Sequence, residues 1–290
     1  MQTLMDVATL KDRLDAAGTA GGRTVVLDVR WALGDPHGRD HYLAGHLPGA
    51  VFVDLAKELA GPADPRLGRH PLPAPEEFQA SVRSWGVRHG DAVVAYDDSS
   101  NQAAARLWWM LRHAGFPEVY LLDGGLAAWR GAGFGLESGG RQAPPGDAVL
   151  TFGAMPVIDA GQAAVWAEQG LLLDARAGER YRGEFEPVDP RAGHIPGAVS
   201  VPTAGNLGPD GRFLSPAALR ERFTGHGVRA DVPTAVYCGS GVTAAHEIAA
   251  LEIAGFPAAL YPGSFSEWSN NAANPVVTGD APYADASAAD

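Results

Sequence analysis

The chain has one cysteine, Cys238, in a segment whose residue types suit nucleophilic chemistry. It follows a short apolar run and opens a loop of small residues, Cys238-Gly239-Ser240-Gly241-Val242-Thr243. Glycines let the backbone turn tightly, so that several amide N–H groups can converge on one point. A helix that follows the loop would present its positive end to the same point. We therefore expect residues 239–243 to cradle a Cys238 thiolate or a persulfide anion.

Two hydroxyl groups add to this loop. Ser240 and Thr243 can both donate hydrogen bonds, and Ser240 is placed to relay a proton to or from a substrate at Cys238. The alternative is that Cys238 is a small, inert residue at the end of a buried strand. The cysteine alone does not decide between these interpretations.

Composition excludes several other classes of protein. A single cysteine permits neither an internal disulfide nor a zinc site with several thiolates, and it favours a reducing cytoplasm. The net charge of −12 argues against nucleic acid as the main partner. No apolar run reaches the ~18 residues of a membrane span, and residues 1–14 do not resemble a secretory leader. We expect neither a metal nor an organic cofactor.

Five sequence motifs occur twice in the same order, 139 to 148 residues apart. The pairs are Leu27–Arg30 with Leu173–Arg176, Ala44–Val51 with Ala192–Val199, Val94–Tyr96 with Ala235–Tyr237, Ala114–Pro117 with Ala254–Pro257, and Gly124 and Trp129 with Gly263 and Trp268. A conserved order with variable loop lengths indicates a tandem duplication. The Gly- and Pro-rich stretch at Gly139–Gly146 suits a linker, placed at 141–149, which predicts one domain over 1–140 and another over 150–290.

Each half alternates short apolar runs with helical stretches. Strands are predicted at Thr24–Asp28, Ala92–Tyr96, Glu118–Leu122, Leu171–Asp174, Thr234–Tyr237 and Ala258–Tyr261, and helices at Ala103–Ala114 and Ala244–Ala254. Further helices are expected to start near Pro75 and Ser215-Pro216. This alternation predicts an α/β fold with a mainly parallel sheet in each half. Ligands bind such sheets beyond the carboxyl ends of the strands, where Cys238 lies.

The two halves differ at the cysteine. Alignment of Tyr96 with Tyr237 places Asp97 opposite Cys238, so the first half has no nucleophile there. Its loop carries two carboxylates, Asp97 and Asp98, which would repel an anion. We therefore expect the second half to be catalytic and the first to be a degenerate partner.

The order of these motifs resembles the two-domain rhodanese superfamily of sulfurtransferases. Within it, the loop from Cys238 to Thr243 resembles that of 3-mercaptopyruvate sulfurtransferases. The thiosulfate-specific branch carries basic residues at the second and third loop positions, where this chain has Gly239 and Ser240. Phosphatases of this fold use an Arg six positions after the Cys, whereas position 244 is Ala.

The resemblance implies roles for residues outside the loop. It implies that Arg180 and Arg191 bind the substrate carboxylate and ketone, which suits the bidentate geometry of guanidinium. The alternative is that they form surface ion pairs with the acidic residues nearby, and Arg182 could be confused with Arg180. The resemblance also implies that His46 assists proton transfer, with Asp35 or Asp40 as its partner. His194 has the same sequence context, so His46 could instead brace its loop. Trp268 could line the pocket, but it corresponds to Trp129 in the other repeat, which favours a role in core packing.

These expectations define a two-step sulfur transfer through a Cys238 persulfide. The donor is 3-mercaptopyruvate, and the acceptor is an external thiol, such as thioredoxin or a small thiol, or cyanide in an assay. Two alternatives remain open: thiosulfate as the donor, and a non-enzymatic sulfur carrier.

Overall fold

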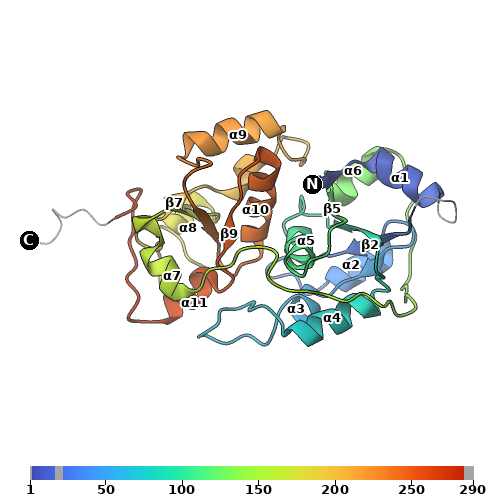
Figure 1. Cartoon of the computed structure of the whole chain (residues 1–290), viewed down its shortest axis with the longest axis horizontal. Helices are drawn as coiled ribbons and strands as arrows, with labels where there is room; N and C mark the ends of the chain where they lie inside the picture. The colour runs from blue at the N-terminus through green and yellow to red at the C-terminus, as the bar shows by residue number, and fades with distance from the viewer. Residues whose placement is uncertain (1, 17–21, 284–290) are drawn as a thin grey trace, which may run out of the picture. The chain divides into compact units, whose positions relative to one another are not determined.

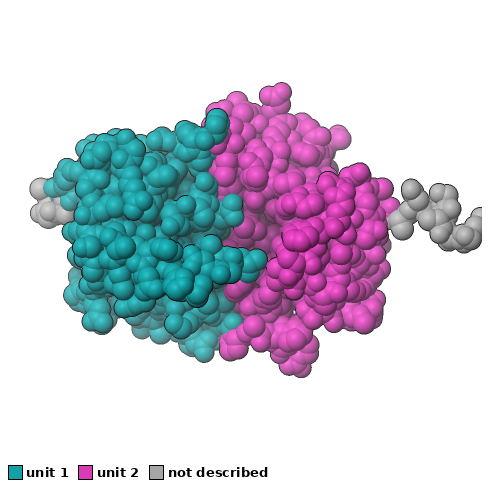
Figure 2. Space-filling model, turned by 180° about the vertical axis from the view of Figure 1, so that it is seen from behind, with its two compact units in different colours: residues 1–61, 72–155, 209–213 teal, residues 62–71, 156–208, 214–290 magenta. Residues whose placement is uncertain are grey.

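The computed structural model describes residues 2–16 and 22–283 and divides into two compact units. Unit 1 contains residues 1–61, 72–155 and 209–213, and unit 2 contains residues 62–71, 156–208 and 214–290 (Figure 2). The chain passes from unit 1 to unit 2 at residues 155–156, so the linker predicted at 141–149 belongs to unit 1. Two short segments belong to the unit that is formed mainly by the other half of the chain. Residues 62–71 belong to unit 2 and residues 209–213 belong to unit 1.

Unit 1 is built on a five-stranded parallel sheet in the order β1-β5-β4-β2-β3. The strands are β1 (Leu4–Met5), β2 (Thr24–Asp28), β3 (Val51–Phe52), β4 (Ala92–Tyr96) and β5 (Val119–Leu122). The strands predicted at 24–28 and 92–96 have the expected bounds, and both are buried runs, as parallel strands covered on two faces require.

Helices cover both faces of this sheet. They are α1 (Val7–Asp15), α2 (Gly38–Ala44), α3 (Leu55–Glu58), α4 (Pro75–Ser84), α5 (Ala104–His113) and α6 (Gly125–Gly131). One core cluster joins α1 and α6 to the sheet through Leu10, Val94 and Trp129. The predicted helix at 103–114 is α5, which packs on β4 and β5.

Unit 2 repeats this design with a four-stranded parallel sheet in the order β7-β6-β8-β9. The strands are β6 (Leu171–Asp174), β7 (Val199–Ser200), β8 (Thr234–Tyr237) and β9 (Ala259–Leu260). A single parallel bridge from Val157 to Leu260 stands where β1 pairs with β5 in unit 1. The predicted α/β fold with two parallel sheets is confirmed.

The helices of unit 2 are α7 (Ala160–Val165), α8 (Gly178–Tyr181), α9 (Pro216–Gly225), α10 (Thr243–Ala254) and α11 (Ser264–Asn270), with 3₁₀ turns η1 (Trp166–Glu168) and η2 (Thr203–Asn206). Residues of α7, α8 and α11 form one core cluster with β6 and β8. Helix α10 packs on β8 and β9 on the other side of the sheet, and α9 packs against α10 (Figure 1). Among the described residues, no helix has the length and apolar character needed to cross a membrane.

The repeated residues make the same contacts in both units. Arg30 donates to both carboxylate oxygens of Asp28 at 2.7–3.1 Å, and Arg176 does so to Asp174 at 2.6–3.1 Å. The indole N–H of Trp129 donates to the Gly135 carbonyl at 2.9 Å, and Trp268 donates to Pro275 at 2.8 Å. The ion pairs Arg30–Asp28 and Arg176–Asp174 are almost completely buried. The duplicated motifs therefore stabilise the fold of each unit.

Candidate active site

Cys238 directly follows β8 at the carboxyl edge of the sheet, and its side chain is 1% exposed. The amide of Gly241 donates to Cys238 Sγ at 3.2 Å. Gly241 has a φ of +76°, a conformation that favours glycine and turns this amide back toward the sulfur. Helix α10 begins two residues later, at Thr243, so its N-terminal end follows the loop. This geometry supports the predicted cradle around the cysteine sulfur.

The start of α11 holds the loop from the other side. The Cys238 amide donates to Ser264 Oγ at 3.1 Å, and the Cys238 carbonyl accepts from the Phe265 amide at 3.0 Å. The Gly239 carbonyl accepts from the Ser266 amide at 2.8 Å. Because these bonds fix both peptide groups, the loop is preorganised before any substrate arrives.

Ser240 contacts a histidine that the sequence did not single out. His70 Nδ1 lies 2.8 Å from Ser240 Oγ, and Ser240 is 8% exposed. His70 comes from residues 62–71, which we call the strap and which belong to unit 2. The pair places an acid–base group one hydrogen bond from the cysteine loop.

The strap is anchored on the start of α11. The Arg69 amide donates to Ser266 Oγ at 3.1 Å. Gly68 has a φ of +93°, and a Cβ there would lie 2.6 Å from the Gly263 carbonyl oxygen. Only glycine permits this approach, which places Arg69 and His70 at the loop.

Arg180, which is predicted to bind the substrate, lies beside the loop. A Cβ added to Gly239 would lie 3.3 Å from Arg180 Nη1. Arg180 also donates to Glu186 at 2.6 and 3.1 Å and to Asp189 at 3.0 Å. Burial alone would raise the pKa of Glu186, but hydrogen bonds from Arg180 and from two amides hold that pKa below its ordinary value.

Arg191 has different surroundings. Its guanidinium donates to four backbone carbonyls at 2.7–3.1 Å, all in or just after α11, from Trp268, Ser269, Asn271 and Asn274. The carbonyls of Trp268 and Ser269 lie in the last turn of α11, where a helix leaves acceptors without intrahelical partners. Arg191 therefore caps the end of α11 in this structure, and its contact with a substrate carboxylate stays a prediction.

His46 lies in unit 1 and is 2% exposed. Its Nδ1 lies 2.9 Å from the Tyr42 carbonyl, and the two rings stack at 4.1 Å. His194 repeats this with Tyr181, at 2.9 Å and 3.7 Å. The shared geometry favours the bracing alternative for His46. The histidine observed at the cysteine loop is His70.

A model of the rhodanese-like domain matches residues 6–132 and 159–271 of the chain. The chain belongs to the rhodanese family. It is 49% identical over 264 residues to a probable 3-mercaptopyruvate sulfurtransferase of Pseudomonas aeruginosa, covering 88% of this chain and 93% of that protein. It is 46% identical over 285 residues to a putative thiosulfate sulfurtransferase of Mycobacterium tuberculosis, covering 97% and 98%.

Solved structures agree with the family. The crystal structure of SseA from Escherichia coli, a 3-mercaptopyruvate sulfotransferase, superimposes with a TM-score of 0.80 at 33% identity. The match covers 91% of this chain and 99% of SseA. The rhodanese fold and the repeated domain are therefore confirmed, while relatives differ in the sulfur donor that they are named for.

In the rhodanese repeat of unit 1, the loop that corresponds to the Cys238 loop surrounds an aspartate side chain. Asp97, at the position of Cys238, is fully buried and accepts four amide hydrogen bonds at 2.7–3.0 Å. The four amides belong to Ser99, Asn101, Ala103 and Ala104. Burial raises the pKa of Asp97, and the four amide donors oppose that rise. The unit 1 loop has a carboxylate in place of a cysteine nucleophile, and this carboxylate accepts the hydrogen bonds of the loop amides.

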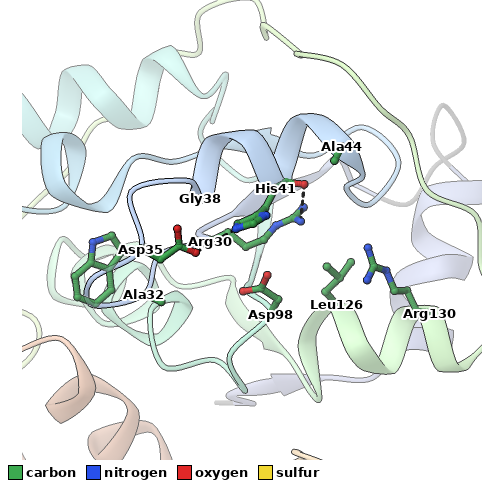
Figure 3. Close-up of a pocket in the computed structure, with 10 residues that line it drawn as sticks. Arg30, Ala32, Asp35, Gly38, His41, Ala44, Asp98, Leu126 and Arg130 are labelled. Carbon is green, nitrogen blue, oxygen red and sulfur yellow. Dashed lines mark hydrogen bonds and ion pairs between the residues drawn. The ribbon is translucent and has the colours of Figure 1, made fainter.

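A cavity of about 270 Å³ lies near this loop in unit 1 (Figure 3). Asp98 and Asp35 extend carboxylates toward it, and Arg130 lies at its other end. Arg30 also lines the cavity, but its guanidinium is held by Asp28 and by the carbonyls of His41 and Gly45. With two carboxylates in its wall and no cysteine, this cavity does not suit the chemistry of an anionic sulfur donor.

Sequence reasoning missed Arg69 and His70. The repeat contained a signal: Gly68-Arg69-His70 precedes α4 as Gly211-Arg212-Phe213 precedes α9, and each segment belongs to the unit formed mainly by the other repeat. In the alignment of the two repeats, His70 thus corresponds to Phe213, a difference comparable to that between Cys238 and Asp97.

Among the described residues, no group of three or more His, Cys, Asp or Glu side chains is arranged to hold a metal ion.

Proposed function

We propose that this chain transfers sulfur from 3-mercaptopyruvate to a thiol through a persulfide on Cys238. Relatives that match nearly its whole length make it a sulfurtransferase. The observation that carries the mechanism is the preorganised loop, in which Cys238 Sγ accepts the Gly241 amide and Ser240 contacts His70.

In the first half-reaction, the Cys238 thiolate attacks the sulfur of 3-mercaptopyruvate. An S–S bond forms, the C–S bond breaks, and its electron pair leaves with carbon as the enolate of pyruvate. The proton of the donor thiol ends on that carbon, giving pyruvate and the anion Cys238-S–S⁻. Ser240 and His70 are placed to carry this proton.

In the second half-reaction, an external thiol takes the outer sulfur and regenerates Cys238. The chain has no second cysteine that could do so. The proposed acceptor is a small thiol or thioredoxin, and the proposed setting is the cytoplasm. The loop amides stabilise the persulfide anion between the two steps.

Thiosulfate is the second candidate donor. The name of the Mycobacterium tuberculosis relative supports it, and so do cationic side chains near the loop. Gly239 and Ser240 favour 3-mercaptopyruvate, because neither loop residue supplies a cation to a sulfonate bonded directly to the transferred sulfur.

The test is the initial rate of sulfur transfer from each donor, with cyanide and with dithiothreitol as acceptors. The parent protein is compared with Cys238→Ser. We expect a large preference for 3-mercaptopyruvate that the substitution abolishes. A preference for thiosulfate would overturn the donor assignment, and transfer from neither donor would favour a carrier role.

A further inference from the structure

The cavity of about 270 Å³ in unit 1 lies near the loop that corresponds to the cysteine loop of unit 2 (Figure 3). Asp98 lines this cavity, and the alignment of Asp97 with Cys238 makes Asp98 the counterpart of Gly239. In unit 2, a Cβ on Gly239 would lie 3.3 Å from Arg180 Nη1. The same position of the repeat therefore carries a carboxylate in unit 1 and lies beside a cation in unit 2.

One end of the cavity carries two carboxylates. Asp98 is exposed and forms no hydrogen bond or ion pair with any other residue that the structure describes. Asp35 accepts from the His37 amide at 2.8 Å, and its Oδ2 lies 3.1 Å from His41 Nε2. These contacts hold the pKa of Asp35 below its ordinary value, so this carboxyl is ionised near neutral pH. This end of the cavity is therefore anionic.

The opposite end is cationic. Arg130, in α6, is exposed and has no hydrogen bond or ion pair within the described part of the chain. Leu126 lies one turn earlier on the same helix, and its apolar side chain lies between Asp98 and Arg130 (Figure 3). The charge of Arg30, which also lines the cavity, is balanced by Asp28 through contacts at 2.7–3.1 Å. The cavity thus has opposite charges at its two ends and an apolar side chain between them.

We propose that this cavity binds a small zwitterion, with the ammonium group of the ligand at Asp35 and Asp98 and its carboxylate at Arg130. An ammonium group has three N–H donors, enough for both carboxylates, and a guanidinium can bind a carboxylate through two N–H groups. The proposal concerns unit 1 alone, and it does not depend on the sulfur transfer proposed for unit 2.

Other small ligands match the cavity less well. A simple anion would be repelled by the two carboxylates, and a simple amine would leave Arg130 without a partner. Because the charges lie at opposite ends, the two charged groups of the ligand must be several bonds apart, with methylene groups against Leu126. An ω-amino acid such as 4-aminobutyrate has this form. The cavity is slightly smaller than the roughly 300–1,000 Å³ of pockets for drug-sized molecules, which also indicates a small ligand.

Calorimetric titration of the full-length protein tests the proposal with three probes. 4-Aminobutyrate carries both charges far apart, glycine carries both on one carbon, and butylamine lacks the carboxylate. We expect 4-aminobutyrate to bind one site per chain, roughly tenfold more tightly than glycine or butylamine. Added salt should weaken this binding, because the charged side chains are exposed to solvent.

Single substitutions test each end of the cavity. Asp98→Asn should raise the dissociation constants of 4-aminobutyrate and butylamine roughly tenfold, because both probes carry the ammonium group. Arg130→Gln should raise only that of 4-aminobutyrate, so that the variant no longer distinguishes the two probes. Asp40→Asn and Arg39→Gln are matched controls, because both residues are exposed on α2 and lie outside the cavity lining. These two variants should match the parent.

Arg180→Gln is the control for binding in unit 2, and thermal unfolding of each variant monitors the fold. This variant should bind 4-aminobutyrate as the parent does. The proposal is overturned if 4-aminobutyrate shows no saturable binding up to about 10 mM, or if the parent binds butylamine equally well. It is also overturned if Asp98→Asn and Arg130→Gln leave the affinity unchanged, and loss of binding in Arg180→Gln alone would place the ligand in unit 2.

Discussion

Cys238 and Ser240 were identifiable from sequence because their neighbours are small residues at the end of an apolar strand. His70 and Arg69 were not, since 168 residues separate His70 from Cys238 and no local pattern links them. A loop residue becomes functional only through the fold that brings it to the site. Gly68, whose positive φ permits the strap to approach α11, makes that contact possible.

Replacement of His70 tests its part in proton transfer. His70→Asn can keep a hydrogen bond to Ser240 but cannot take up a proton near neutral pH. We expect kcat with 3-mercaptopyruvate to fall roughly a hundredfold with little change in KM. Because both side chains serve one relay, His70→Asn combined with Ser240→Ala should lose no more than the worse single variant. Losses that multiply would show that the two residues act independently.

The longer strands and helices followed from sequence, with ends that shifted by one or two residues. Strands β2, β4, β6 and β8 have the predicted bounds because their apolar runs end at polar residues or at the reactive loop. Two-residue strands such as β1 and β7, and four-residue helices such as α8, were not predicted. Such short elements contain too few residues for a periodic pattern, and their hydrogen-bond partners come from distant parts of the chain.

The loop after β4 keeps its fold although Asp97 stands where the other repeat has Cys238. Asp97→Ala would leave three buried amides and one partly buried amide without their acceptor, and we expect the free energy of unfolding of unit 1 to fall by roughly 3 kcal/mol or more. Denaturant unfolding checks this. Asp98→Ala is the control, because Asp98 is exposed on the same loop and should be nearly neutral. Equal effects of the two substitutions would contradict the account.

The whole chain is a duplication in which each repeat gives a short segment to the other unit. Repeated residues such as Asp28 and Asp174 hold the scaffold together, and the unequal pairs Cys238/Asp97 and His70/Phe213 distinguish the unit that we propose to be catalytic. The duplication and fold were predictable from sequence because motif order survives changes in loop length. The exchange of segments was not, because linear order assigns each segment to its own half.

Stability against pH should depend on Glu247 of α10. Burial raises the pKa of this carboxyl to about 8, while its Oε2 accepts from Asn206 Nδ2 at 2.7 Å. Between its ordinary pKa of 4.5 and about 8, the unfolded chain loses the proton that the folded chain keeps. The free energy of unfolding therefore falls as pH rises through this window, by at most about 1.4 kcal/mol per pH unit.

Glu247→Gln removes that titration and keeps an acceptor for Asn206. We expect the variant to gain stability relative to the parent as pH rises from 5 to 8, measured by denaturant unfolding at each pH. A difference between the two proteins that does not change with pH would show that Glu247 does not titrate as described.

A single-turnover experiment tests the central claim most directly. The protein is mixed with 3-mercaptopyruvate without an acceptor, trapped with an alkylating agent and analysed by peptide mass spectrometry, while released pyruvate is measured. We predict one extra sulfur atom on Cys238 and one equivalent of pyruvate per active site. Release of pyruvate without sulfur on Cys238, or no reaction with 3-mercaptopyruvate, would contradict the account.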